Sequence, residues 1–416
     1  MTGNPPSPED PEQFPFWRRN ARFIALGCFL NPLGFTVAFP YLPLIVRELG
    51  VEGELELAVG VLVFGFFGLT FLLAPVWGTM ADHYGRRSMV LRAGLGMAVG
   101  FLLMGLSASF PLFMLWYVLV GTCNGYVPAA LALVATNTPR QHMGRALSTA
   151  QTGALLGTTC GPALGAWLVT VLPAYRHLYL VSAGFCVAAG LIALFFVREQ
   201  FTRPQGPLRF HMLADVRAIL RVPGMGPLLR LNFVTHMMLF GSTTVVSLFV
   251  LELLEGRTVW SGVSMETWVG ASTLALTIAS AMALPFWGRA LDRFEPRRFA
   301  AVALLAALVA TVPFPLVQDP LQLTVARVVL GLLAVGIQPA TIRLVKEWSP
   351  PGMDGRALAL GSAVQAMGNG TGPLLAGLIG PWLGLRAYFA FISLIVLGSL
   401  TEWVLRGVRR QEAPIP

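Results

Sequence analysis

The stretch "GTMADHYGRR", residues 78–87, closes a run from Leu57 to Ala81 that contains no Asp, Glu, Lys, Arg or His. An α-helix needs about 20 apolar residues to cross a bilayer, so this run is long enough to span one. Polar side chains then follow within a few residues: Asp82, His83, Arg86 and Arg87. A second stretch, "GRALDRFEPRR" at residues 288–298, ends another uncharged run in nearly the same way. The pattern predicts membrane helices that end in basic turns.

Runs of this kind continue along the whole chain. Of the 416 residues, 55% are hydrophobic and only 12% are charged, whereas soluble domains carry about 25% charged residues. The runs, some with one His or Arg inside, are Phe23–Val46, Leu57–Ala81, Ala93–Pro139, Ala146–Tyr175, Leu178–Val197, Leu231–Leu251, Thr267–Gly288, Phe299–Gln318, Pro320–Ile342, Ala357–Leu385 and Ala387–Thr401. The third is twice the needed length and breaks at "SASFP", residues 107–111, and the last extends to about Leu405. We therefore predict an all-α polytopic membrane protein with twelve transmembrane helices.

The Lys and Arg residues lie mostly in every second connection between the spans, which places them on one side of the membrane. With both termini placed in the cytoplasm, 24 of the 29 Lys and Arg residues fall in the tails and in the cytoplasmic connections. Four fall in the outer connections, Arg47, Arg176, Arg257 and Arg386, and Arg327 lies within a span. This bias is the positive-inside rule and predicts a multi-pass protein of the cytoplasmic (inner) membrane. The formal net charge of +9 is then a topology signal and gives no reason to expect a nucleic-acid partner. The cysteines all fall inside predicted spans without zinc-site spacing, so we expect neither a metal nor a cofactor.

Four motifs repeat at one spacing. "PVWGTMAD" at 75–82 matches "PFWGRALD" at 285–292, Gly121 matches Gly331, "GRAL" recurs at 144 and 355, and "GTTCGPALGA" at 157–166 matches "GNGTGPLLAG" at 368–377, always 210 or 211 residues apart. Six spans per copy is an even number, so the copies are parallel repeats. The predicted organisation is a cytoplasmic tail at 1–22, a six-helix bundle at 23–197, a linker at 198–226 with an amphipathic helix near His211–Leu220, a second bundle at 227–405 and a tail at 406–416.

This arrangement resembles the major facilitator superfamily and, within it, the twelve-span bacterial drug–proton antiporters of the multidrug efflux group. The opening stretch fits the family's loop motif at Gly78, Asp82, Gly85, Arg86 and Arg87. The resemblance implies a conformational clasp, in which Asp82 engages the start of span eleven near Gly355–Arg356 when the transporter is open to the outside. The alternative is a basic turn that only sets topology. The second copy keeps Asp292 but has Glu295-Pro296 where the first has Gly85-Arg86, so its clasp role is less certain.

Span five carries a second resemblance. Its small residues lie one turn apart and form a groove into which another helix can press: Gly153, Gly157, Gly161, Pro162 and Gly165. The resemblance implies an exporter signature that shapes the interface between the halves, with Ala166 as a departure from the family's final Gly. The alternative is generic membrane helix packing.

The third feature departs from the family, which often has an Arg in span four, four residues before a Gly, linked to proton coupling. Here Tyr117 stands there, and Arg327 has that position in the second half. Arg327 either faces the cavity or snorkels to the surface. His236 is a candidate proton carrier or a structural residue. By resemblance, spans 1, 4, 7 and 10 line a cavity, which makes candidates of Asn31, Tyr117, Asn124, Asn232, His236, Arg327 and Gln338.

These features predict a secondary active transporter that exports hydrophobic or amphipathic compounds by alternating access, with protons as the expected counter-ion, lipid around it and a monomeric state. No zinc-protease, P-loop or nucleophile-elbow motif is present, so we expect no enzyme and no ATP-driven pump. Two alternatives stay open. One is a dedicated and uncoupled carrier for a single metabolite or lipid, which the absence of Asp and Glu deep in the spans favours. The other is a membrane sensor or scaffold that no longer transports.

Overall fold

The computed structural model describes the chain except residues 1–15, 52, 202–211, 255–258, 351–352 and 412–416. It is almost entirely helical. The α-helices are α1 (Trp17–Ala38), α2 (Leu42–Glu48), α3 (Leu55–Tyr84), α4 (Arg86–Leu106), α5 (Phe110–Val120), α6 (Tyr126–Thr136), α7 (Arg140–Val171), α8 (Leu178–Phe195), α9 (Met212–Leu220), α10 (Met225–Thr244), α11 (Val246–Leu253), α12 (Met265–Arg293), α13 (Pro296–Thr311), α14 (Pro320–Ala334), α15 (Ile337–Trp348) and α16 (Asp354–Gln411). A two-residue pair, β1 (Val259–Trp260) and β2 (Val263–Ser264), forms a small antiparallel hairpin.

These helices form the twelve expected spans. Ten of the described helices or helix pairs are long and apolar enough to cross a membrane, and α10 with α11, bent by 50°, makes an eleventh. The twelfth lies within α16, where Gly384 has a left-handed φ of 78° and separates two helices. A residue with a Cβ rarely adopts this φ, so the glycine marks the turn between spans eleven and twelve.

The spans extend beyond the uncharged runs. α1 begins at Trp17, and α3 continues through Asp82 to Tyr84. The uncharged run marks only the part of a helix that faces hydrocarbon, while the helix itself continues into the polar region. The amphipathic helix expected near His211–Leu220 is α9.

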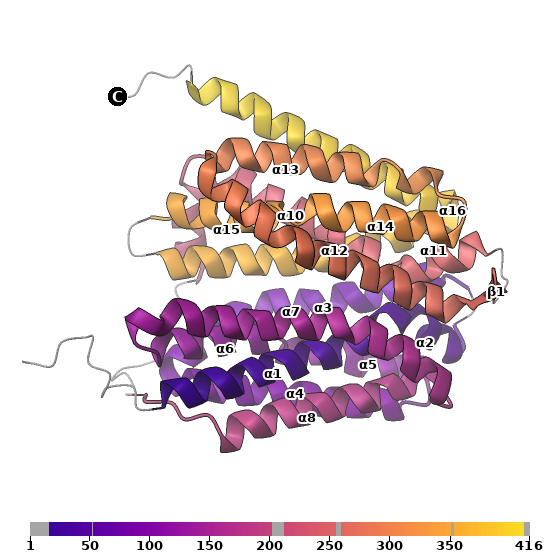
Figure 1. The fold of residues 1–416 in the computed structure, drawn as a ribbon, viewed down its shortest axis with the longest axis horizontal. Coiled ribbons are helices and arrows are strands. Elements are labelled where there is room, and N and C mark those ends of the chain that lie inside the picture. Colours follow the sequence, from indigo (N-terminus) through magenta and orange to yellow (C-terminus); the bar gives the residue numbers. More distant parts are fainter. Residues whose placement is uncertain (1–15, 52, 202–211, 255–258, 351–352, 412–416) are drawn as a thin grey trace, which may run out of the picture.

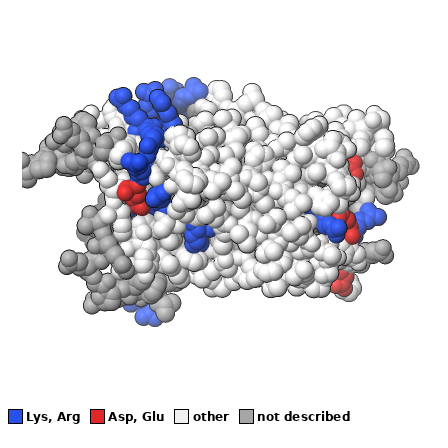
Figure 2. All heavy atoms as spheres, turned by 90° about the horizontal axis from the view of Figure 1, so that it is seen from below, with Lys and Arg blue, Asp and Glu red and all other residues white. Residues whose placement is uncertain are grey.

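The spans lie side by side in two groups (Figure 1). The N half contains α1 to α8, and the C half contains α10 to α16. Both described chain ends lie at one end of the molecule, which we call the linker end, and the β1–β2 hairpin lies at the other, the hairpin end. Figure 2 shows Lys and Arg gathered mainly at the linker end of one face, with a broad uncharged band beyond them. Large apolar side chains such as Leu72 and Trp167 remain exposed on the spans, as expected for a surface that meets lipid.

The internal repeat is visible in the contacts. Gly121 in span four packs against the carbonyl oxygen of Phe66 in span two, and Gly331 in span ten packs against that of Leu276 in span eight. Each residue of the second pair is 210 positions beyond its counterpart in the first. The same spacing that relates the motifs therefore relates the helix contacts, and the two six-helix bundles are parallel copies of one design.

The two halves touch at the hairpin end. Gly60 in α3 packs on the backbone of Pro373 and Leu374 in α16, and Gly377 packs on the backbone of Glu56. Gly270 in α12 fits against Ala166 in α7. Such close approaches require residues without large side chains.

Four helix glycines near the linker end have free space beside them. At Gly78, Gly144, Gly288 and Gly355, no described residue beyond the chain neighbours and the glycine's own helix backbone lies within 4 Å of where a Cβ would stand.

Candidate transport site and gates

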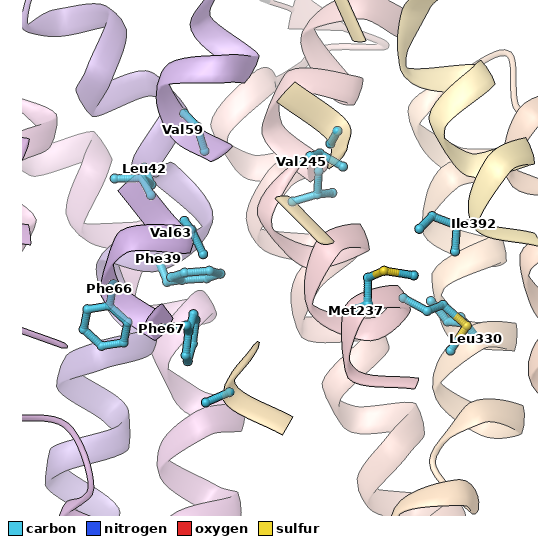
Figure 3. Packing of buried hydrophobic residues seen from close by; sticks show 14 of the residues in the cluster. Phe39, Leu42, Val59, Val63, Phe66, Phe67, Met237, Val245, Leu330 and Ile392 are labelled. Carbon is cyan, nitrogen blue, oxygen red and sulfur yellow. The ribbon is translucent and has the colours of Figure 1, made fainter. Parts of the chain in front are cut away.

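An aromatic contact closes the centre of the molecule between the halves. The Phe240 ring of α10 lies 4.8 Å from the Phe39 ring and 4.9 Å from the Phe67 ring, measured between ring centroids. Phe35 and Phe66 extend this cluster into the N half. Figure 3 shows Phe39, Phe66 and Phe67 on the helices of the N half, and Met237 across from them on the C half. Aromatic and Met side chains adapt to apolar guests of different shapes.

The N half holds a small pocket beside this contact. Its walls are almost entirely aromatic and apolar: Phe35, Phe39, Phe66, Phe101, Met104, Tyr117, Val120 and Tyr179. The enclosed volume is about 10 Å³, enough for one water-sized group. Tyr117 lies inside this bundle and is only 3% exposed. The sequence predicted that Tyr117 lines the central cavity, and the structure places it in this pocket inside the N half.

Arg327 occupies the equivalent place in the C half and is completely buried. Its Nε donates to the carbonyl oxygen of Ser272 at 3.1 Å, and its Nη1 donates to that of Ser242 at 2.8 Å. The Ser242 carbonyl lies in the last turn of α10, where carbonyls lack a helical partner and attract a cation. The snorkelling alternative is therefore wrong, because main-chain carbonyls inside the bundle hold the guanidinium. Its Nη2 has no hydrogen-bond partner among the described residues.

His236 and Asn369 form a second polar position in the C half. They lie on α10 and α16 and are 7% and 8% exposed. The Nε2 of His236 and the Oδ1 of Asn369 are both buried without a partner among the described residues. One turn earlier, Asn232 donates to the carbonyl oxygen of Gly361 at 2.8 Å and ties α10 to α16. Such unpaired polar atoms are costly in a membrane interior, which makes this a functional candidate.

Other predicted cavity residues lie elsewhere. Asn31 points into the N half, where its amide donates to the sulfur atoms of Met97 and Cys186, so the prediction that it lines the central cavity is wrong in this structure. Asn124 lies at the break between α5 and α6, and its amide donates to the Thr70 hydroxyl at 3.4 Å. Gln338 is partly exposed near the start of α15.

The span-five signature packs mainly within its own half. Gly153, Gly157 and Gly165 lie against the backbone carbonyl oxygens of Ala25, Phe29 and Val37, and Gly161 lies against Thr36, so the glycine stripe receives α1. The expectation that the whole signature shapes the interface between halves is too broad. Its other edge faces the C half, where Pro162 and Ala166 lie against Gly270 of α12.

The loop-motif residues form a joint at the linker end of the N half. Gly85 has a left-handed φ of 89°, which turns the chain between α3 and α4. The backbone amides of Arg86 and Arg87 donate to the Glu199 carboxylate at 2.8 and 2.9 Å. The Arg87 side chain donates to the carbonyl oxygens of Ala193 and Leu194 at the end of α8. The Glu199 carboxylate thus binds the start of α4, and the Arg87 guanidinium binds the end of α8.

The expected clasp between Asp82 and the start of α16 involves a side chain that the structure does not describe. The backbone of Asp82 is in α3, but its side chain lies outside the described part of the structure. Asp292 is exposed at the end of α12. Arg356, near which Asp82 was expected to bind, pairs with Asp215 of α9 at 2.8 Å. The sequence motifs did not indicate Glu199 or Asp215 as binding partners, because both residues lie in the linker region, which carries no recognisable motif.

Glu266 joins the halves at the hairpin end and was also missed. The Tyr175 hydroxyl donates to its Oε1 at 2.8 Å, and the Tyr41 hydroxyl donates to its main-chain oxygen at 3.4 Å. Two hydrogen bonds between the halves therefore end on this one residue. Both tyrosines belong to the N half. No sequence signal finds such a contact, because the partners are 91 and 225 positions away.

The position of Arg92 also differs from the prediction. The charge pattern counted it with the basic turn, yet it lies six residues inside α4 and is half-buried. Its guanidinium lies 3.9 Å from the centroid of the Trp77 ring, and its Nη1 donates to the Thr122 carbonyl oxygen at 2.8 Å, at the break in span four. Its Nε is buried without a partner among the described residues.

Two parallel six-helix bundles, closed at one end around an apolar centre, define a membrane transporter. The sequence comparison agrees, since the family model of the Major Facilitator Superfamily matches residues 24–275 and 260–416. The chain therefore belongs to the Major Facilitator Superfamily and is a transporter, not an enzyme.

Named relatives and solved structures match over nearly the whole chain. "Multidrug resistance protein MdtG" of Citrobacter koseri is 33% identical over 406 residues, which cover 95% of this chain and 97% of that protein. The protein of that name from Escherichia coli O17:K52:H18 is 32% identical over 410 residues, 96% of each.

The similar structures show the same fold. The crystal structure of the human organic anion transporter MFSD10 (TETRAN) has a TM-score of 0.72 at 20% identity, covering 93% of this chain and 99% of that one. A bacterial homologue of the human lysosomal transporter Spinster, in an inward-facing and unoccupied conformation, has a TM-score of 0.77 at 17% identity, covering 94% and 97%.

Proposed function

We propose that this protein exports hydrophobic or amphipathic compounds across the cytoplasmic membrane by proton antiport. It does so by alternating access, as a monomer with both termini in the cytoplasm. The observation that carries the proposal is the apolar contact between the two halves at Phe39, Phe67 and Phe240. The name that the relatives carry, multidrug resistance protein, supports the same function.

The orientation makes the linker end cytoplasmic, because the Lys and Arg residues gather there. In this proposal the conformation described above is the inward-open state, and the hairpin end is the closed outer gate. Export requires the opposite state as well. In that state the tyrosine contacts on Glu266 break, and the open glycines of the linker end come together.

The expected clasp belongs to that second state. When the linker end closes, Asp82 at the end of α3 reaches the start of α16, near Gly355 and Arg356. Arg356 must first leave Asp215 of the linker helix, a contact between largely exposed side chains that costs little to break. The joint that Gly85 and Arg87 form with α8 keeps α3 and α4 in place while the halves move.

Proton coupling runs through His236 in this proposal. Among the described residues it is the titratable side chain with a near-neutral reference pKa that lies deep in a span, and Asn369 stands beside it. Protonation would let the imidazolium donate to the unpaired Oδ1 of Asn369 and change the contact between α10 and α16. The role of Arg327 in coupling would be indirect, through its hold on Ser242 of the same helix.

The test uses inverted membrane vesicles that contain the full-length protein, and a panel of hydrophobic fluorescent compounds. Uptake should require an imposed proton gradient, continue without ATP and stop when an ionophore dissipates the gradient. His236→Gln should transport without acidifying or alkalising either side, whereas Asn232→Gln should keep coupling. Gradient-independent uptake by the unaltered protein would remove the antiport claim.

A second candidate is a dedicated, uncoupled carrier for one metabolite or lipid. The observation that favours it is the lack of any Asp or Glu deep within the described spans. The same panel separates the two functions, because a dedicated carrier accepts one compound and ignores the gradient.

A further inference from the structure

One helix contact occurs in both halves but uses a different hydrogen-bond donor in each. In the C half, the indole Nε1 of Trp287 donates to the carbonyl oxygen of Leu332 in span ten at 2.8 Å. Trp77 and Thr122 stand 210 positions earlier, at the equivalent places of the N half. There the Thr122 carbonyl oxygen accepts instead from Nη1 of Arg92, also at 2.8 Å.

Arg92 leaves the tryptophan of the N half without an acceptor. Its guanidinium lies 3.9 Å from the centroid of the Trp77 ring, and Trp77 Nε1 is buried with no hydrogen-bond partner among the described residues. The residue of the second copy that corresponds to Arg92 is Val302, whose side chain has no donor. A buried N–H without an acceptor is costly. Trp77 is therefore a second donor for the carbonyl oxygen that the arginine now occupies.

This carbonyl oxygen lies where span four breaks. Arg92 also reaches the Asn124 carbonyl oxygen at 3.4 Å. The Asn124 backbone is extended, with a ψ of 151°, and Gly125 has a left-handed φ of 119° before α6 begins. In span ten, Gly336 precedes α15 with helical φ and ψ angles of −67° and −21°. The sharper break thus occurs with the arginine, and the more regular backbone occurs with the tryptophan.

We propose that Arg92 and Trp77 exchange on the Thr122 carbonyl oxygen when the transporter changes state. Arg92 holds the break in the present conformation, and Trp77 takes the carbonyl oxygen when the linker end closes. Trp77 directly precedes Gly78, where free space remains, so closing that end shifts α3 at the level of Trp77. Both are positioning residues, because the break sets the direction of α6, the part of span four nearer the linker end (Figure 1). This inference rests on the alternating access of the proposed function.

The experiment measures the distance between spin labels at Gly144 and Gly288, one in each half, by pulsed electron spin resonance on the full-length protein in lipid nanodiscs. Arg92→Val installs the residue of the second copy and frees the carbonyl oxygen for the indole. It should raise the fraction of short distances by roughly twofold or more. Trp77→Phe keeps an aromatic ring beside the guanidinium but removes the N–H donor, and it should lower that fraction.

Two further variants serve as controls. Arg343→Val removes an arginine of the C half whose Nη1 donates to the Leu291 carbonyl oxygen at 2.8 Å, a hydrogen bond of the same kind outside the exchanging pair. It should leave the distances unchanged. Arg92→Lys keeps a cation that can bind the carbonyl oxygen, so it should restore most of the long distances that Arg92→Val loses.

Opposite shifts in Arg92→Val and Trp77→Phe support the exchange, because a general loss of stability would not move the two variants in opposite directions. Shifts in the same direction, or no shift in either variant, overturn it and leave the proposed function intact. If the unaltered protein gives one unchanging distance with every compound of the panel, alternating access itself is wrong. Should Arg92→Val not fold, Trp77→Phe still decides, since an unaltered fraction of short distances in that variant contradicts the role of the indole.

Discussion

At the scale of single residues, several charged side chains bind main-chain groups at helix ends. Glu199 accepts from the first amides of α4, Arg87 donates to the last carbonyls of α8, and Arg327 donates to the last turn of α10. Helix ends leave amides and carbonyls unpaired, and lipid offers no water to satisfy them. Glu199, Arg87 and Arg327 therefore each satisfy main-chain groups that a helix end leaves unpaired.

Replacing Glu199 should destabilise the N half. In Glu199→Ala the amides of Arg86 and Arg87 lose their acceptor, and loss of a helix cap costs about 1 kcal/mol. The free energy of unfolding in detergent measures this. Glu347→Ala, which removes one partner of an exposed pair with Arg343, is the matched control and should change stability less. Equal effects of the two substitutions would contradict the joint.

Asp82→Asn should lower the transport rate while the protein still inserts normally into the membrane. The amide keeps the shape of the side chain but loses the charge that favours a helix start. Initial uptake rates at equal protein levels in vesicles provide the measurement. Transport at the unaltered rate would mean that the loop motif only sets topology.

At the scale of elements, close helix pairs hold each half together. The glycine stripe of α7 receives α1, and in the second copy Gly368 and Gly372 of α16 receive α10 at the carbonyl oxygens of Phe233 and Met237. Within lipid, such pairs gain van der Waals contact only when the backbones come close. Because Phe39 directly follows α1 and Phe240 lies in α10, these pairs position the centre.

Gly157→Ala should therefore disturb the N half. A Cβ there would overlap the carbonyl oxygen of Phe29, and overpacking of this kind costs about 1–3 kcal/mol. Gly184→Ala is the matched control, because an added Cβ at Gly184 of α8 meets open space. Thermal unfolding of both variants in detergent compares them, and an equal loss of stability would show that the stripe is not tightly packed.

At the scale of the whole molecule, the two halves are joined at the hairpin end by glycine contacts and by two tyrosine hydrogen bonds on Glu266. Glu48 accepts from the Tyr175 amide at 2.6 Å and holds that loop in place. Few polar contacts need to break for the end to open. A weakly held gate suits a protein whose two open states must be close in free energy.

Tyr175→Phe should shift the population towards the state that is closed at the linker end. The substitution removes the hydroxyl that donates to Glu266 and keeps the ring. Spin labels at Gly144 and Gly288, on α7 and α12, should then report a larger fraction of short distances by pulsed electron spin resonance. Labels at Gly144 and Gly184, within one half, should report no change. An unaltered distribution between the halves would show that this hydrogen bond does not hold the gate.

The amino-acid sequence by itself determined the twelve spans, the internal repeat and the family resemblance, because span length, charge bias and glycine spacing are local properties of the chain. Only the tertiary structure decided where polar side chains point. Asn31 turned into its own bundle, Arg327 reached carbonyl oxygens 55 and 85 positions away, and Glu266 met two tyrosines of the other half. Each orientation depends on which backbone group lies unpaired nearby, and that depends on how distant helices pack.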